Sequence, residues 1–530
     1  MNRFLRAPFD MLRAVLCILC VWMLSSCAPA TSTPPPADPV LVTVDPNSTA
    51  TPTPFQPAPA TDTLIPSATS IPTNTPPPTS TITSTPLPTD TVTPAPTIPP
   101  ASPVPVLTRT QYTMYANLDY AAKTVAVNET IKYFNTTGQT LDNIVMAVEP
   151  NLWSNCFTLT SITEDGIALT NYSLDGQRLT VYPPQPIQAG AVTTFTIGYG
   201  IAIPAKQYEN TFGYLGYQIN LTDWYPFIVP YSGGWVLHEP WSFGEHLVYD
   251  PADYEVNVKV SDPNVIIAAS GAPEVVQDWT RYTVSGARTF ALSASDKFKI
   301  AESAVGSAAI RSYYFAGDED AGQAVLWMAT QSLGLYGVKF APYPYPVLNV
   351  VETEVPDGQE FDGLVFLAEK FYSEYNGTAK SNLFTIGTHE IAHQWWFGLV
   401  GNDQAVEPWL DEAMSVYSER IFYEYNYPKY GDWWWNFRVN YFGPSGYVDT
   451  SIYNGGTFRL YTNAVYLNGA NFLDDLRTRI GDEAFFDFLQ DYATRFSHGR
   501  ATGYDFFAIL RLHTDKDLSD IMKTYFQVQY

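Results

Sequence analysis

The residues Thr388 to Gln394 read T-H-E-I-A-H-Q and form the most informative stretch of the 530-residue chain. Two histidines at positions i and i+4 lie on one face of a helix, so the imidazoles of His389 and His393 can reach the same metal ion. Ser381 and Asn382, upstream of the motif, are typical N-cap residues and support a helix here. The chain contains only 6 His, so two at this spacing around Glu390 argue against a chance pair of core histidines. The stretch therefore predicts a metal-binding helix that also carries an acid.

A third metal ligand is expected downstream of this helix. A hydrolytic zinc usually has three protein ligands and one open position for water. The long form of the motif with a third histidine is absent, since Trp396 stands where its glycine would be. Pro408–Ala413 reads P-W-L-D-E-A, and Pro408 is suited to open a second helix, where its missing N–H does no harm. Glu412, separated from His393 by eighteen residues, would lie in the first turn of that helix.

The composition indicates a folded, acidic protein. Apolar residues make up 46% of the chain, with 13 Trp, 36 Tyr and 30 Phe, enough for a sizeable core. The length allows two or three domains. The net charge of −25, with no basic patch to offset it, makes nucleic acid an unfavourable partner. Of the 4 Cys, Cys156 stands alone in the body of the chain, so no disulfide framework is expected.

The N-terminal segment has the pattern of an export signal. Three arginines precede the apolar run Ala14–Leu24, whose 11 residues are too few to span a bilayer. Residues 24–27 read L-S-S-C and resemble the bacterial lipobox, so we expect residues 1–27 to be a lipoprotein signal peptide and Cys27 to be lipidated. An ordinary secretory signal with a chance cysteine is the alternative.

Residues 28–107 are rich in Pro, Thr, Ser and Ala, without one Lys or Arg. Such a stretch cannot bury a core and is typical of a disordered, semi-rigid tether. It would hold a domain away from a membrane, and an O-glycosylated or wall-spanning stalk is equally consistent with its composition. We therefore expect an exported lipoprotein at the cell surface or facing the periplasm.

Residues 108–315 show the pattern of an antiparallel β domain. Short runs rich in Tyr, Thr, Val and Ile alternate with clusters of Gly, Asn, Asp and Pro. The predicted strands include Tyr112–Tyr120, Thr124–Phe134, Thr193–Tyr199, Tyr254–Val260 and Val265–Ala269. A sandwich or a saddle of antiparallel sheets fits this pattern.

Residues 316–530 are predicted to form a mainly α domain. Ala321–Leu335 has apolar residues at helical spacing, Val347–Val351 is typical of a short buried strand, and helical segments dominate from Asn382 onward. The change of pattern places the domain boundary near residue 315.

H-E-x-x-H, followed after eighteen residues by a glutamate in a W-L-x-E block, resembles the aminopeptidase N family of zinc metallopeptidases, the gluzincins. The resemblance covers most of residues 108–530 in the order of its parts, a β domain and then a thermolysin-like catalytic domain. It implies one Zn²⁺ held by His389, His393 and Glu412, with Glu390 as the general base and peptides as substrates. Zinc lowers the pKa of water to about 7 and polarises the scissile carbonyl, and an adjacent carboxylate can pass the water proton to the leaving amine.

A second block of the family is similar to residues 357–364, which read D-G-Q-E-F-D-G-L. The family has a Gly-x-Met-Glu-Asn segment on an edge strand. Glu360 matches its glutamate, whereas Gln359 and Phe361 replace the Met and the Asn. The resemblance implies that Glu360 binds the free α-amine of the substrate, a contact favoured by partial desolvation. The alternative is that Glu360 is a turn carboxylate on a loop between Pro356 and Gly363.

A third block, Y-L-N-G from Tyr466, is similar to the Tyr-x-Lys-Gly block of the family, with Asn468 in place of the Lys. It implies that the Tyr466 hydroxyl stabilises the tetrahedral oxyanion. Tyr461 is the nearby alternative. Glu419, seven residues after Glu412, could orient a ligand histidine or could be a solvated helix residue.

The function that these observations favour is a zinc aminopeptidase acting on peptides outside the cytoplasm. Most members of the family carry a further helical domain that closes over the cleft, whereas 64 residues follow Tyr466 here, so we expect an open cleft. An endopeptidase is therefore one alternative, although Glu360 argues against it. A catalytically degenerate surface lipoprotein that binds peptides or glycans is the other, although the intact Glu390 argues against that one. The expected partners are peptides and, through the lipid on Cys27, a membrane.

Overall fold

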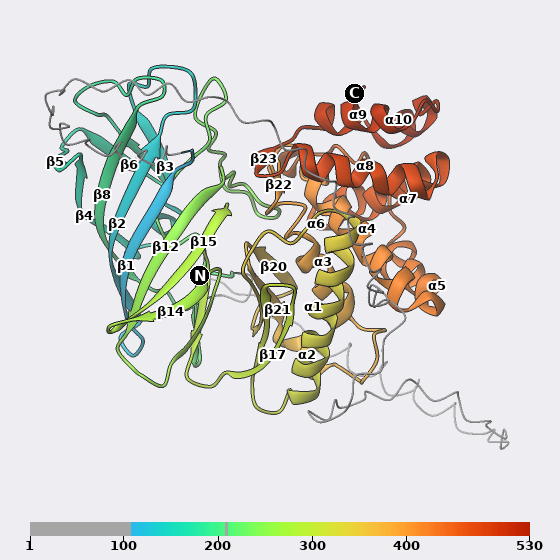
Figure 1. The fold of residues 1–530 in the computed structure, drawn as a ribbon, viewed down its shortest axis with the longest axis horizontal. Coiled ribbons are helices and arrows are strands. Elements are labelled where there is room, and N and C mark those ends of the chain that lie inside the picture. The colour runs from blue at the N-terminus through green and yellow to red at the C-terminus, as the bar shows by residue number, and fades with distance from the viewer. Residues whose placement is uncertain (1–107, 207–209) are drawn as a thin grey trace, which may run out of the picture. The chain divides into compact units, whose positions relative to one another are not determined.

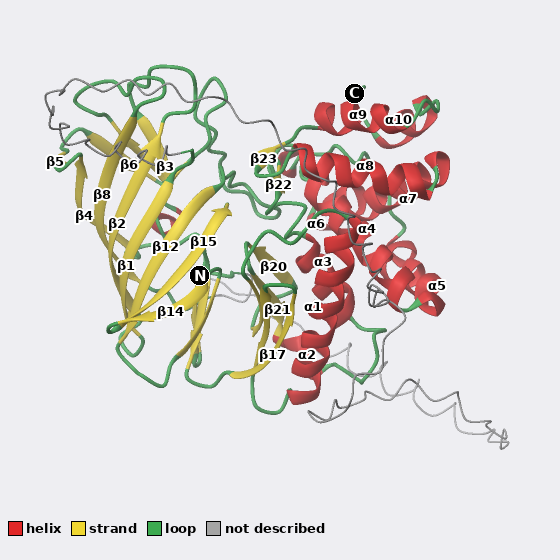
Figure 2. Ribbon diagram, viewed as in Figure 1, coloured by secondary structure: helices red, strands yellow, loops and turns green. Residues whose placement is uncertain are grey.

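The computed structural model describes residues 108–206 and 210–530. The predicted signal peptide, Cys27 and the tether of residues 28–107 lie outside the described residues. The described part begins with sheets and ends with helices, as Figures 1 and 2 show. Within it, no helix combines the length and the apolar character needed to cross a membrane.

An eight-stranded sheet dominates the N-terminal portion of the described residues. Its order is β14 (Ala272–Val276), β15 (Trp279–Ala287), β12 (Ala252–Val260), β1 (Gln111–Asp119), β2 (Thr124–Phe134), β8 (Val192–Ala202), β4 (Phe157–Glu164) and β5 (Ile167–Ala168). Buried and exposed residues alternate along β2, because successive side chains of a strand point to opposite faces. The strands predicted within β1, β2, β8 and β12 are confirmed.

One pairing in this sheet departs from the expected antiparallel arrangement. β1 and β12 run parallel, with Gln111 opposite Asp253 and Leu118 opposite Val260. Turn residues in the sequence indicate only hairpins between strands that are neighbours in the chain. No such turn connects β1 and β12, so the sequence could not predict that they pair. The β portion is therefore mixed, although antiparallel pairs prevail in it.

Two smaller sheets complete the β portion of residues 108–206 and 210–295. The first has the order β13 (Ile266–Ala269), β16 (Leu292–Ser295), β10 (Gln218–Leu221) and β9 (Gly213–Leu215). The second has the order β11 (Phe227–Ile228), β3 (Ile144–Ala147), β7 (Arg178–Val181) and β6 (Tyr172–Asp175). Their inner faces and that of the large sheet share one core, which is rich in Tyr and Ile.

A five-stranded sheet connects the β portion to the helices. Its order is β17 (Lys299–Val305), β18 (Ala308–Tyr314), β19 (Val347–Thr353), β21 (Leu364–Ala368) and β20 (Gly358–Phe361). β18 pairs in parallel with β19, so this sheet contains strands from both sides of residue 315. The helix α1 (Glu319–Lys339) packs against β17 and β18, and the short β20 forms an edge.

The remaining chain is mainly helical, as expected. Its helices are α2 (Glu369–Ser373), α3 (Asn382–Ala392), α4 (Trp409–Asn426), α5 (Gly431–Trp434), α6 (Phe458–Thr462), α7 (Asn468–Ile480), α8 (Asp482–Arg495), α9 (Gly503–His513) and α10 (Ser519–Tyr525). The short strands β22 (Val400–Gly401) and β23 (Gly499–Arg500) pair in parallel. The aromatic side chains of Trp395 and Trp396 are fully buried in the core around α3 and α4. The helices α7 to α10 are stacked at the C-terminal end (Figure 1).

A buried arginine joins the β portion to the helical portion. The Nε of Arg288 donates to the carbonyl of Phe397 at 2.6 Å, and its Nη1 donates to the carbonyl of Tyr249 at 3.0 Å. The carboxylate of Asp362 accepts from the backbone N–H groups of Arg288 and Thr289 at 2.9 and 2.7 Å. Arg288 is 2% exposed, and its charge is matched by these acceptors instead of by water.

The core of the β portion contains a titratable group that predicts a pH-dependent stability. Glu129 on β2 is 0% exposed, and burial raises its pKa well above the usual value, which the nearby Tyr199 hydroxyl offsets only in part. The folded state therefore holds the Glu129 proton more tightly than the unfolded state. The stability that this group contributes is complete below the unfolded pKa of about 4.3 and is lost as the pH rises toward the folded pKa.

We expect Glu129→Gln to be more stable than the wild type at pH 8, by about 1–3 kcal/mol, and to differ much less at pH 5. Thermal unfolding of both proteins at the two pH values measures this difference. Glu255→Gln, at a half-buried position on β12, is the control and should show no such pH-dependent gain. An equal gain for Glu129→Gln at both pH values would mean that ionisation of Glu129 is not its cause.

Candidate active site

The helix α3 carries the H-E-x-x-H motif in its last turn. Ser381 is its N-cap residue, as predicted, although its side chain makes no capping hydrogen bond. The helix ends at Ala392, and His393 follows it as the C-cap with a helical backbone conformation. Leu383 to Ala392 are all buried, so the helix is held on every side by the core. This packing fixes the direction of both imidazoles.

The predicted ligands converge on one point. The Nε2 of His389 lies 3.1 Å from the Oε2 of Glu412 and 3.2 Å from the Nε2 of His393, and the Nε2 of His393 lies 3.5 Å from the same Oε2. Three corners of a tetrahedron around an ion with bonds of about 2.0–2.1 Å are separated by roughly 3.3–3.4 Å. These atoms therefore already stand at about the spacing that a tetrahedral metal site needs. Glu412 lies in the first turn of α4, as expected, with Pro408 as the N-cap instead of the first helical residue.

The second nitrogen of each ring is held by a fixed acceptor. The Nδ1 of His393 donates to the carbonyl of Trp396 at 2.9 Å, and the Nδ1 of His389 donates to the carboxylate of Glu419 at 3.1 Å. These two contacts fix the ring orientations, so each Nε2 points toward Glu412 and offers its lone pair to a metal once that nitrogen is deprotonated. Of the two interpretations of Glu419, the structure supports the one in which it orients a histidine. Its side chain is 0% exposed and also accepts from Arg438 at 2.9 Å.

The charge balance around these atoms fits a bound cation. Burial alone would lower the pKa of His389, but its hydrogen bonds to Glu412 and Glu419 outweigh burial and raise that pKa to about 9. Burial raises the pKa of Glu390 to about 8. The buried carboxylates thus exceed the cations available from the described residues near them, and a divalent metal would correct this excess. The donor set of two imidazoles and one carboxylate is the one that zinc prefers in catalytic sites.

Glu390 lies next to this point without being one of its three ligands. One oxygen of Glu390, one of Glu360 and one nitrogen of His393 lie within 4.8 Å of one another. The edge strand β20 leaves room for Glu390 at Gly358, where any added Cβ would collide with its side chain. A side chain at position 358 would therefore displace the Glu390 carboxylate from its present position.

Glu360 lies on β20, an edge strand, and not on a loop, so its interpretation as a turn carboxylate is wrong. Its side chain is 5% exposed and accepts a hydrogen bond from the Nε2 of Gln359 at 2.8 Å. Its Oε1 has no hydrogen-bond partner in the described part of the chain and lies 3.8 Å from the Nδ1 of His393. This oxygen is available to accept a hydrogen bond from a ligand.

Two adjoining cavities meet at this carboxylate. The main cavity, of about 660 Å³, contains the metal-site residues, Glu390 and Tyr466. The side cavity, of about 130 Å³, extends toward Asp223 in the β portion. The lining residues that both share are Gly244, Glu245, Gln359 and Glu360.

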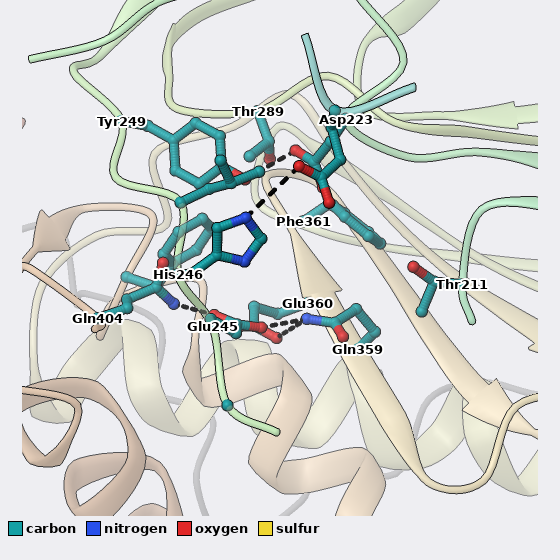
Figure 3. Close-up of a pocket in the computed structure, with 14 residues that line it drawn as sticks. Thr211, Asp223, Glu245, His246, Tyr249, Thr289, Gln359, Glu360, Phe361 and Gln404 are labelled. Carbon is teal, nitrogen blue, oxygen red and sulfur yellow. Dashed lines mark hydrogen bonds and ion pairs between the residues drawn. The ribbon is translucent and has the colours of Figure 1, made fainter. Parts of the chain in front are cut away.

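Glu245 is a candidate functional residue that the sequence did not reveal. It accepts hydrogen bonds from the side chains of Gln359 and Gln404 and lies beside Glu360 (Figure 3). It comes from the irregular segment between β11 and β12, which has no periodic pattern or motif that would indicate a site. Its proximity to Glu360 depends entirely on the way the β portion packs on the catalytic portion.

Tyr466 lies in the main cavity, where its hydroxyl donates to the Oε1 of Glu412. It belongs to a π-helical turn, Asn463–Leu467, a form often found at functional sites. Gly469 packs so closely on Ala413 that a Cβ at this position would collide, which explains the glycine of the block. Tyr461 is 1% exposed, stacks edge-on against Tyr466 and does not line either cavity. The geometry therefore favours Tyr466 over Tyr461.

The orientation of His389 by Glu419 gives a testable result. Glu419→Gln should lower the affinity for zinc by about 10–100-fold, because it weakens the hydrogen bond that fixes the ring and leaves Arg438 without its counter-charge. Competition with a chromogenic chelator measures the affinity. Glu424→Gln, further along α4 and paired with Arg477 at 2.8 Å, is the matched control and should bind zinc normally. Equal affinities of the Glu419 variant and the wild type would show that the ring is held by other contacts.

Comparison with known proteins agrees with this geometry. Residues 336–525 match the family model described as the peptidase family M1 domain. The chain is 26% identical to Aminopeptidase M1-B of Oryza sativa subsp. japonica over 237 residues, which are 42% of this chain and 27% of the relative. It is 26% identical to Aminopeptidase N of Lactobacillus delbrueckii subsp. lactis over 208 residues, 35% of this chain and 24% of the relative. The aligned part thus spans about a quarter of the length of these curated relatives.

A solved structure extends the likeness to the fold of the β portion. A mutant of the M1 zinc metallopeptidase of Deinococcus radiodurans, bound to a Tyr-Ser-Ala substrate, superposes with a TM-score of 0.58 at 17% identity. The superposition covers 80% of this chain and 96% of that chain. The predicted order of a sheet-rich portion followed by a helical catalytic portion is confirmed.

Proposed function

Residues 336–525 form an aminopeptidase N-like M1 peptidase domain, and from this premise we propose that the protein is a zinc-dependent aminopeptidase that removes N-terminal residues from peptides. The observation that carries the proposal is the convergence of His389, His393 and Glu412 next to two further buried acids, Glu390 and Glu360. The zinc that these three residues would hold supplies a Lewis acid and lowers the pKa of water.

Glu390 is the general base of the proposed reaction. Its carboxylate lines the main cavity beside the metal ligands without being one of the three converging groups, so it is free to take a proton from the attacking water. It then passes that proton to the leaving amine. The Tyr466 hydroxyl, which now donates to Glu412, is placed to donate to the negative oxygen that develops on the scissile carbonyl.

Two carboxylates support recognition of a free N-terminus. Glu360 presents an oxygen without a hydrogen-bond partner in the described part of the chain, and Glu245 adds a second carboxylate at the same wall of the main cavity. An ammonium donates several hydrogen bonds, and charged hydrogen bonds in a partly desolvated site are among the strong ones. A blocked N-terminus has no positive charge to place there. This feature favours an aminopeptidase over an endopeptidase.

The direct test is hydrolysis of amino-acid p-nitroanilides or β-naphthylamides by the purified protein, with and without a chelator. We expect activity on free amino-acid anilides, loss of that activity with the chelator and its return with zinc. N-acetylated anilides are the control and should be poor substrates. Cleavage of acetylated peptides at rates equal to those of free peptides would favour the endopeptidase alternative, and chelator-resistant or absent hydrolysis would overturn the proposed function.

The proposal includes export and a lipid anchor at Cys27, with the tether of residues 28–107 as a spacer. The support comes from the sequence, since an apolar run too short to span a bilayer precedes a small-residue site and a cysteine. We expect Cys27→Ser to move the protein from the membrane pellet to the soluble fraction of its host, while the p-nitroanilidase activity per molecule stays the same. A variant that still sediments with membranes would show that Cys27 is not the attachment point.

A further inference from the structure

The side cavity is acidic at both of its ends. Glu245 and Glu360 lie at the end shared with the main cavity, and Asp223 lies at the opposite end with Tyr249 (Figure 3). Glu149 also lines that far end, where it lies 3.5 Å from the Nε2 of His246. Four carboxylates therefore line the side cavity, and the imidazole of His246 is the one basic side chain among its described lining residues.

Neither lysine nor arginine is among the described residues that line the side cavity. The Tyr249 hydroxyl donates to the Oδ1 of Asp223 at 2.7 Å, and the Nε2 of His246 donates to the amide oxygen of Gln177 at 3.1 Å, with the Oε2 of Glu149 further away at 3.5 Å. The Oε2 of Glu149 is buried and has no hydrogen-bond partner within the described residues. Burial, with a smaller contribution from the Glu149 carboxylate, raises the pKa of Asp223 to about 6. A cation at this end would stabilise both ionised carboxylates.

The near end of the side cavity contains a buried carboxylate oxygen that can accept a hydrogen bond from a ligand. The Glu360 side chain is 5% exposed, and its Oε1 has no hydrogen-bond partner among the described residues. In the proposed function this oxygen binds the α-ammonium of the substrate. The scissile carbonyl of the same residue must reach the metal ligands in the main cavity. The side chain branches from the carbon between these two groups, so it is the substituent that can enter the side cavity.

The walls between the two ends of the side cavity are partly apolar and can contact the methylene groups of a long side chain. Leu247, Phe361 and the ring of Tyr249 line the cavity together with Asp223 and Glu149. Lysine and arginine place their methylene groups along apolar surface while the charged head reaches a polar partner. An apolar wall that leads to two carboxylates matches that pattern and gives an acidic side chain no counter-charge.

Building on the proposed aminopeptidase function, we propose that the side cavity binds the first side chain of the substrate and selects a basic residue, arginine or lysine, through Asp223 and Glu149. The α-ammonium of the substrate then contacts Glu360 and Glu245. The guanidinium of arginine, or the side-chain ammonium of lysine, lies at the far end beside Asp223 and Glu149. The enzyme is thereby a peptidase for peptides with basic N-termini.

The experiment compares kcat/KM for the p-nitroanilides of arginine, citrulline and leucine. Citrulline has nearly the shape of arginine and no charge, so the arginine-to-citrulline ratio isolates the charge. We expect a ratio of about 10–150 in the wild type, the factor of one hydrogen bond to a charged group. Asp223→Asn should reduce the ratio at least tenfold while kcat/KM for leucine anilide stays within about threefold.

The chosen variants keep the fold. Asp223 has a left-handed backbone with φ of 47°, which Asn tolerates well, and the Asn amide oxygen can still accept from Tyr249. Glu149→Gln is the second variant and should lower the ratio in the same direction. Thr211→Val changes a neutral wall of the same cavity and is the control that should leave the ratio unchanged.

Three results would overturn the inference. They are a wild-type ratio near one, an equal loss on all three substrates in Asp223→Asn, and a fall in the ratio for Thr211→Val as large as that for Asp223→Asn. Hydrolysis of leucine anilide that depends on zinc would leave the proposed function standing in each of these cases. Absence of hydrolysis of all three anilides would overturn the proposed function and this inference together.

Discussion

Replacing Glu390 by glutamine is expected to reduce turnover by about 10²–10⁴-fold and to leave the zinc content unchanged. Glutamine keeps the size of the side chain but cannot take a proton from the attacking water. The metal should stay, because the ligand atoms that converge belong to His389, His393 and Glu412. Steady-state hydrolysis of an amino-acid p-nitroanilide, together with metal analysis of the same sample, measures both quantities.

Glu352→Gln is the matched control for this variant. Glu352 is also buried, lies on β19 of the sheet that carries β20, and lines neither of the two cavities. The Glu352 side chain accepts a hydrogen bond from the backbone N–H of Phe315 at 2.8 Å, which the amide oxygen of glutamine can still accept. The control should keep turnover within about threefold. Near-normal turnover of the Glu390 variant would show that another group activates the water.

Removal of the Glu360 side chain is expected to separate the two kinds of substrate. Glu360→Ala should lower kcat/KM for peptides with a free N-terminus by about 30–1000-fold, the cost of a charged hydrogen bond in a partly buried site. Peptides with an acetylated N-terminus never make this contact, so their slow hydrolysis should hardly change. Glu354→Ala, an exposed position on the preceding segment that lines neither cavity, is the control.

The two outcomes for Glu360→Ala carry different conclusions. A loss confined to free peptides would establish Glu360 as the residue that recognises the α-amine. Equal losses on free and acetylated peptides would mean that Glu360 supports the site without touching the amine. In that case an endopeptidase with an open cleft would be the better interpretation of the main cavity.

The metal site could be predicted from the sequence because most of its information is local. The spacing of His389 and His393 places both rings on one helical face whatever the rest of the chain does. Glu412 requires only that a second helix begins shortly afterwards, and Pro408 indicates that start. The orientation of His389 by Glu419 follows from the same pair of helices, although the sequence alone left open whether Glu419 is solvated.

The parts of the site that depend on tertiary packing could not be predicted. Glu245 lies beside Glu360 although more than a hundred residues separate them, and the segment around Glu245 has no periodicity. The side cavity likewise draws Asp223 from the β portion and Phe361 from β20. Propensity and turn chemistry predicted individual strands such as β2, but they could not predict which distant strands pair, as the parallel contact of β1 with β12 shows.

The five-stranded sheet limits how the chain can be divided for expression. A fragment that begins at residue 316 would lack β17 and β18, so β19 would become an uncovered edge with a row of free N–H and C=O groups. All seven residues of β19 are buried in the intact protein, and such an edge is a template for aggregation. The same fragment would lose Arg288 and with it the hydrogen bond to the carbonyl of Phe397. Recombinant production should therefore keep residues 108–530 in one polypeptide, because a cut that preserves both features would have to fall before Arg288.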